Sequence, residues 1–196
     1  MSVANWSDVS EFYIKIANDE SLGGDGMTNM RLQKLLYFAQ GKHLAATGRP
    51  LFDETIKAWP YGPVVPPAYN KYKKYSNGTI ETPVSIYTSD VFDNTEIKTI
   101  LDVARWAEVY STIALMNITH AVGSPWYDTF NTDRYGEISI ESMRLYFLKN
   151  DIIATSINKS SIPSFTFEEE LNAIGIPVVS RGDEDNGDWS EYNNYL

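Results

Sequence analysis

The sequence contains no cysteine, and its 196 residues include only two histidines, His43 and His120. A chain without cysteine can form neither a disulfide framework nor a thiolate metal site, and two histidines are too few for a histidine-rich metal cluster. We therefore expect no metal and no other cofactor. No apolar run approaches the roughly 20 residues of a membrane span, and the first residues lack the basic and apolar regions of a signal peptide. By elimination, the sequence predicts a cytoplasmic protein that does not enter a membrane.

Positive charge is scarce as well: 16 Lys and Arg residues stand against 26 Asp and Glu residues, which gives a net charge of −10 at pH 7. Nucleic-acid binding requires a concentrated positive surface that displaces counterions from phosphate. The basic cluster of Lys71, Lys73 and Lys74 ends a predicted helix, where the helix dipole favours cations. The composition therefore disfavours direct nucleic-acid binding. An acidic surface fits a basic protein partner or simple solubility.

Apolar residues are plentiful, at 43% of the chain with 13% aromatic residues, so a folded core is expected. Helical spacing of apolar residues, together with capping and stop residues, predicts helices over residues 7–18, 28–47, 63–75, 94–108, 111–118 and 139–150, with a short helical turn beginning at Pro125. Residues 55–59 read as a short edge strand, and residues 76–93 as a loop or weak hairpin. The predicted fold class is mainly α: a compact multi-helix single domain with a short β-strand or hairpin element.

The chain changes character after Asn150, which divides it into a helical domain over residues 1–150 and a less regular C-terminal extension over residues 151–196. The end of the extension, residues 181–196, carries five carboxylates and one arginine. Three interpretations stay open: a solvated tail, a tail that folds onto a basic partner, and a tail that packs on its own domain. The second would make anchors of the three aromatic residues in this segment, Trp189, Tyr192 and Tyr195.

Three motifs follow one another along the chain: LQKLLYFAQG at residues 32–41, AWPYGPV at residues 58–64 and THAVGSPW at residues 119–126. In this order and spacing they resemble the signature of the Panacea (SocA-like) antitoxin domain, and residues 138–147 resemble its closing helix. Lys42 departs from the family, many members of which carry an aromatic residue there. The residues that the resemblance marks as structural are Leu32, Leu35, Leu36, Trp59, Gly62, Pro63, His120, Pro125 and Trp126.

The resemblance also implies a function. It indicates an antitoxin, not an enzyme, that neutralises a partner toxin by direct protein–protein contact. Members of the family pair with very different toxins, so the identity of the toxin does not transfer. Two alternatives stay open: a proteolysis adaptor that delivers a toxin to a protease unfoldase, and a phage or prophage protein that binds a host defence factor.

The Tyr-Gly-Pro turn is either an exposed recognition turn or a purely structural one. Tyr and Trp are favoured interface anchors because they offer large rigid area with a polar tip. We expect Trp59 to be buried and Tyr61, Val64 and Val65 to lie near a partner. The helical stripe of Tyr69, Tyr72 and Tyr75 is more typical of core packing, but Tyr69 and Tyr72 are kept as partner-binding candidates.

His120 is the one candidate for a catalytic base. A base needs an orienting carboxylate and a nucleophile or water to act on, and the sequence supplies no recognisable set. We therefore expect His120 to be structural, bonded to a carbonyl oxygen at a helix end and packed on Trp126.

Overall fold

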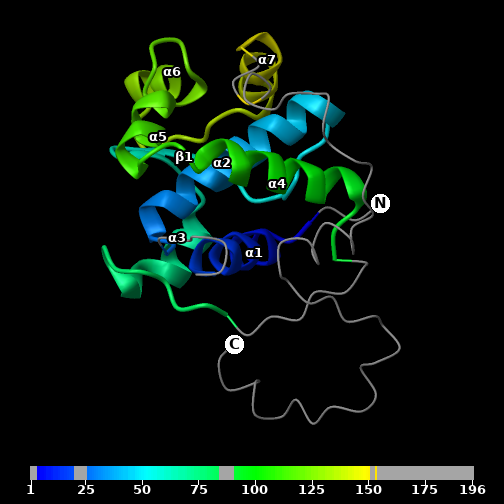
Figure 1. Cartoon of the computed structure of the whole chain (residues 1–196). Coiled ribbons are helices and arrows are strands. Elements are labelled where there is room, and N and C mark those ends of the chain that lie inside the picture. The colour runs from blue at the N-terminus through cyan, green and yellow to red at the C-terminus, as the bar shows by residue number, and fades with distance from the viewer. Residues whose placement is uncertain (1–3, 20–25, 84–90, 151–152, 154–196) are drawn as a thin grey trace.

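The computed structural model describes residues 4–19, 26–83, 91–150 and 153 (Figure 1). Apart from Ile153, the predicted C-terminal extension lies outside these residues. Within the described ranges the fold is mainly α, as predicted, with seven α-helices and one two-stranded antiparallel hairpin. No helix in these ranges is both long and apolar enough to cross a lipid bilayer.

Helix α2 (Asn29–Thr47) runs through the middle of the domain (Figure 1). It begins where the sequence predicts, because the Thr28 hydroxyl accepts a hydrogen bond from the backbone N–H of Arg31 at 3.3 Å. It ends at Gly48, whose left-handed backbone (φ 72°) closes the last turn. Buried residues lie on most of its circumference, so α2 is an axis that other helices cover.

Six further helices complete the described domain, and five of them pack against α2. They are α1 (Trp6–Asn18), α3 (Pro66–Tyr72), α4 (Asn94–Ala107), α5 (Thr112–Thr119), α6 (Pro125–Thr132) and α7 (Ile140–Asn150). Helix α6 instead contacts the hairpin and α7. The helix starts follow local capping chemistry, and Ser111 caps α5. The sequence predicts Asn94 as the cap of α4, but Asp93, one residue earlier, takes this position and forms a capping box with Glu96.

The hairpin consists of β1 (Lys57–Trp59) and β2 (Gly62–Val64), in which Trp59 pairs with Gly62. Strand β1 lies within the predicted 55–59 segment. Its other edge is also paired: the N–H of Ala58 donates to the Gly136 carbonyl at 2.9 Å, and the N–H of Ile138 donates to the Ile56 carbonyl at 2.8 Å. The link between α6 and α7 therefore fixes the hairpin from one side.

The prediction that Pro63 opens a helix is wrong. Pro63 lies in β2, and α3 begins at Pro66, with Pro66 and Pro67 in its first turn. Both Gly-Pro and Pro-Pro are compatible with a helix start, and pairing of Pro63 with Ala58 decides between them.

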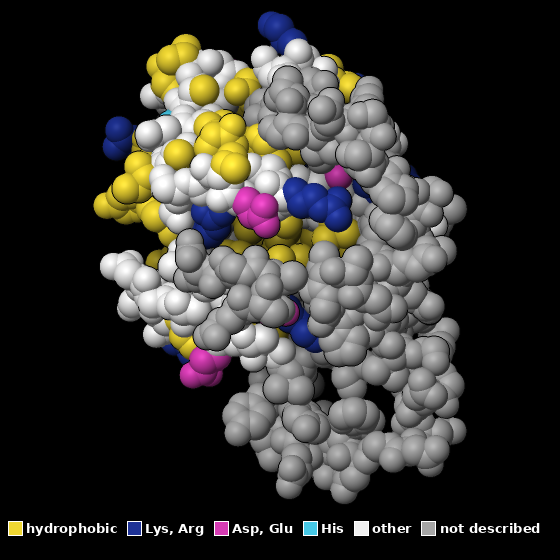
Figure 2. Space-filling model, viewed as in Figure 1, with side chains coloured by type: hydrophobic (Ala, Val, Ile, Leu, Met, Phe, Trp, Pro, Cys, Tyr) yellow, Lys and Arg dark blue, Asp and Glu magenta, His cyan; other side chains and the backbone are white. Residues whose placement is uncertain are grey.

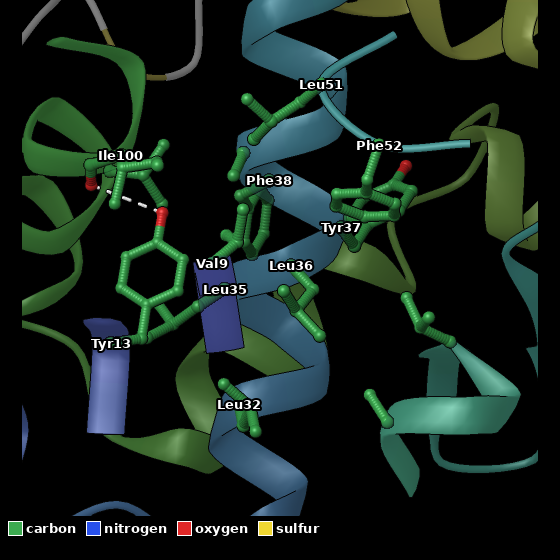
Figure 3. Close-up of a cluster of buried hydrophobic side chains, with 14 of the residues drawn as sticks. Val9, Tyr13, Leu32, Leu35, Leu36, Tyr37, Phe38, Leu51, Phe52 and Ile100 are labelled. Atoms are coloured by element: carbon green, nitrogen blue, oxygen red, sulfur yellow. Dashed lines mark hydrogen bonds between the residues drawn. The ribbon is translucent and has the colours of Figure 1, made fainter. Parts of the chain in front are cut away.

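The core gathers around α2 (Figure 3). Leu35 and Leu36 point into it, beside Phe38 and residues of the loop after α2. Tyr13 reaches across from α1 and donates a hydrogen bond to the backbone carbonyl of Ile100 in α4 at 3.2 Å (Figure 3). The phenol thus packs in the apolar interior with its polar tip satisfied.

Candidate functional site

The three sequence motifs meet at one place, beneath the hairpin. Lys34 from α2 donates a hydrogen bond through its Nζ to the Pro63 carbonyl at 3.3 Å. A Cβ atom placed on Gly62 would lie 2.5 Å from Lys34 Nζ and 3.0 Å from Thr119 Oγ1. We call this set the motif junction, and it consists of Lys34, Gly62, Pro63, Thr119, His120 and Trp126.

Lys34 is the centre of the motif junction and is only 1% exposed. Burial lowers the pKa of Lys34 from 10.5 to about 7, because the charged ammonium loses its water. In the described part of the chain the amine makes no ion pair, and the acceptor that it contacts is a neutral carbonyl. At neutral pH a large fraction of Lys34 is therefore uncharged.

Gly62 is required by two features of the turn. Its φ of 105° lies in the region that favours glycine, and the Lys34 amine occupies the space that a side chain would need. The glycine of one motif and the lysine of another are thus complementary in shape.

His120 ends α5, and its ring lies flat on Trp126, with ring centres 3.7 Å apart and an angle of 5° between the planes. The expected packing on Trp126 is present. The expected bond to a carbonyl is not: His120 Nε2 is buried and has no hydrogen-bond partner among the described residues. Burial, and to a lesser degree the nearby Lys34, lowers the pKa of His120, which favours the neutral form of the ring.

Trp126 connects the motif junction to the hairpin surface. Pro125 lies in the first turn of α6, which Ser124 caps, and the Trp126 indole Nε1 donates to the Trp59 carbonyl at 2.9 Å. This hydrogen bond from α6 therefore fixes the backbone of Trp59 in the hairpin.

Trp59 itself is half-buried, which corrects the expectation of a core residue. Its ring packs edge-on against Tyr69 of α3, with centres 4.9 Å apart, and its centre lies 6.3 Å from that of Tyr135 in the α6–α7 link. Ala58, the neighbouring residue in the alternating strand, takes the buried position. Tyr61 stands at the tip of the hairpin and is 71% exposed.

Three of the partner-binding candidates are buried. For Val64 and Val65 the expectation of a place near a partner is wrong, whereas the burial of Tyr72 agrees with the core packing that its helical stripe favours. Val64 and Val65 lie under α2, where the Val65 N–H donates to Gln33 Oε1 at 2.9 Å. Tyr72 faces the core from α3. The reason is that helical and strand spacing show which residues share a face but not which face is covered.

Tyr61 is exposed and Tyr69 is half-buried, and both stay candidates. The tail candidates Trp189, Tyr192 and Tyr195 lie outside the described residues. Sequence reasoning missed Lys34 and Tyr135. A signal for Lys34 is present, since a lysine inside the apolar run of residues 32–39 is unusual; the position of Tyr135 depends on long-range pairing and carries no local signal.

A separate hollow of about 600 Å³ opens between α1, the start of α2 and the α4–α5 turn. Figure 2 shows apolar side chains on its floor with charged side chains beside it, and its lining includes Arg31, Arg105 and Glu108. None of the motif-junction residues lines it. In the described residues no group of three or more His, Asp or Glu side chains is placed to hold a metal ion.

Comparison with known proteins gives the class of protein. Residues 32–127 match the family described as antitoxin SocA-like, Panacea domain, and this range contains every residue of the motif junction. A curated relative, Antitoxin SocA from Caulobacter vibrioides (strain NA1000 / CB15N), is 34% identical over 114 residues, which cover 51% of this chain and 58% of that protein. No solved structure matches the chain. Residues 32–127 are therefore similar to the SocA-like Panacea domain.

Proposed function

We propose that this protein is an antitoxin that neutralises a partner toxin by direct contact. The observation that carries the proposal is the family match over residues 32–127. This range contains every residue of the motif junction. The three motifs also meet in the fold. Lys34 donates to the Pro63 carbonyl and Trp126 donates to the Trp59 carbonyl, and both hydrogen bonds hold the hairpin in place. The alignment spans 58% of the length of the curated relative.

Occlusion is the mechanism that this architecture fits. A rigid surface of aromatic residues can cover a substrate-binding or active surface of the toxin, and stable interfaces of this kind bury about 1,200–2,000 Å² in total. The net charge of −10 would favour encounter with a basic toxin surface. The tail residues Trp189, Tyr192 and Tyr195 are proposed as a second contact.

An enzymatic role is not proposed. A family of antitoxins suggests a non-enzymatic regulatory protein. His120, the candidate base, stacks on Trp126 with its Nε2 lacking a partner among the described residues, so no described carboxylate orients it from that nitrogen.

Co-expression with the protein encoded by the neighbouring gene tests this proposal. In cells that lack the major ATP-dependent proteases, we expect the intact protein to restore growth and to co-purify with that partner. A matched control is Leu36→Ala, which removes a buried side chain of α2 and should lower rescue only in proportion to the folded fraction. Rescue that requires the proteases would indicate delivery to an unfoldase instead, and no rescue in either strain would contradict an antitoxin role for this pair.

A further inference from the structure

Tyr135 has an unusual backbone for its residue type. Its φ is 68°, in the left-handed region that residues with a side chain seldom adopt. The conformation is held by hydrogen bonds: the Tyr135 N–H donates to the Ala58 carbonyl at 2.9 Å, and the Gly136 N–H donates to the Asp133 carbonyl at 3.0 Å. A glycine or asparagine would adopt this backbone with less strain, so the backbone conformation gives no reason for a tyrosine.

The strained backbone exposes an aromatic ring at a defined place. Tyr135 is 55% exposed, and its ring lies beside Trp59, which in turn packs on Tyr69. These three residues, with Tyr61 at the hairpin tip, come from three separate parts of the chain: β1 and its turn, α3, and the α6–α7 link. We call them the hairpin aromatic face.

The support beneath this face is rigid. Trp126 binds the Trp59 carbonyl, and the backbone of residues 136–138 continues the pairing of β1. Gln33 of α2 holds the Val65 N–H and also donates to Asn29, whose amide donates to the Tyr69 carbonyl at 3.2 Å. Binding to such a surface costs little side-chain ordering, which favours affinity.

We infer that the hairpin aromatic face is the toxin-docking surface, and that it receives a segment of the toxin that carries arginine or lysine. The inference rests on the proposed function. Asp133 and Glu137 are exposed on either side of Tyr135, with Arg134 between them and Lys57 of β1 paired with Glu137 in a β-bridge. The whole chain carries a net charge of −10. Cations stack on the faces of Trp and Tyr rings, and nearby carboxylates strengthen their attraction.

The strain at Tyr135 allows a test that separates binding from stability. Tyr135→Gly should have a melting temperature equal to or above that of the wild type, because glycine relieves the strained backbone, yet it should bind the purified neighbouring-gene product at least tenfold more weakly. Tyr135→Asn, which also tolerates this backbone, should behave alike. Ser76→Gly is the matched control: Ser76 also has a positive φ, of 50°, but lies outside the aromatic face, so its affinity should not change.

The charge of the toxin segment is tested by Glu137→Gln in the same binding assay. We expect slower association and a weaker dependence of the association rate on salt, since an exposed carboxylate is lost. Unchanged affinity of both Tyr135 variants, with the wild type binding, would overturn the docking surface and leave the proposed function standing. Loss of the fold in both Tyr135 variants would equally overturn it, because the ring would then serve stability. A wild type that does not bind would contradict the proposed function itself.

Discussion

At the scale of single residues, the buried Lys34 amine is costly to the fold and couples its stability to pH. Burial lowers the pKa of Lys34 to about 7, whereas the unfolded chain keeps a value near 10.5. Between these two pH values the unfolded state binds more protons than the folded state, so stability rises with pH across this window. Below pH 7 the charge is present in both states and its burial cost is complete.

We therefore expect the free energy of unfolding of the wild type to increase by about 2 kcal/mol from pH 7 to about pH 9. Lys34→Met should be more stable than the wild type at pH 7 and should show a flatter profile. Urea unfolding at several pH values measures this, with Lys74→Met, at an exposed lysine, as the control that keeps the wild-type slope. Parallel profiles of the wild type and Lys34→Met would show that Lys34 does not titrate in this range.

His120 is expected to act as a packing residue. In His120→Gln the amide loses the flat stack on Trp126, which is 3.7 Å between ring centres, so we expect a stability loss of about 1 kcal/mol. Neutralisation of the toxin should fall no further than this loss explains. Complete loss of neutralisation with an unchanged melting curve would instead give His120 a direct role.

At the scale of elements, the sequence predicted what depends on neighbouring residues. Thr28, Gly48 and Ser111 delimit helices because capping and stopping are local interactions. The role of Pro63 was mispredicted because its strand exists only through pairing with Ala58.

The same contrast applies to the site. The motifs identified its members, but the convergence of Lys34, Gly62 and Thr119 depends on how α2, the hairpin and α5 pack together. No local sequence pattern predicts that the side chain of Lys34 in α2 occupies the space beside Gly62 in a turn far along the chain. The half-burial of Trp59 and the position of Tyr135 likewise depend on the pairing of residues 136–138 with β1.

The fit between α2 and the hairpin turn predicts the effect of a single methyl group. Gly62→Ala would combine a positive φ with a contact at 2.5 Å to Lys34 Nζ, so we expect it to cost about 2–4 kcal/mol. Gly123 also has a positive φ, of 77°, but a Cβ atom added there would meet nothing within 4 Å. Gly123→Ala should therefore cost only about 1 kcal/mol.

Thermal or urea unfolding of the two variants measures the difference. On a Lys34→Ala background, the cost of Gly62→Ala should shrink because the contact has been removed, which is a coupling between the two sites. Equal costs at Gly62 and Gly123, with no coupling to Lys34, would mean that the close approach of Lys34 to the turn does not matter for stability.

At the scale of the whole molecule, excess negative charge and surface aromatic residues are the features that a partner would meet. The last 16 residues, 181–196, supply five of the carboxylates that give the chain its net charge of −10, together with three aromatic residues. Charge of this kind chiefly raises the rate of encounter, and aromatic residues prolong the complex.

Deletion of residues 181–196 should therefore leave the melting temperature of the helical domain unchanged and weaken neutralisation. Trp189→Ala should reproduce much of the loss, and added salt should slow association more for the intact chain than for the shortened one. Neutralisation by the shortened chain at the wild-type level would assign the binding surface to the helical domain alone.

The most direct test of neutralisation by contact is a titration of purified toxin activity with the purified protein, without protease and without ATP. If the two proteins bind each other directly, activity should fall with a sharp stoichiometric end point, and Tyr135→Gly should require a higher concentration for the same inhibition. Full toxin activity at saturating concentrations of the folded wild-type protein would contradict the central claim.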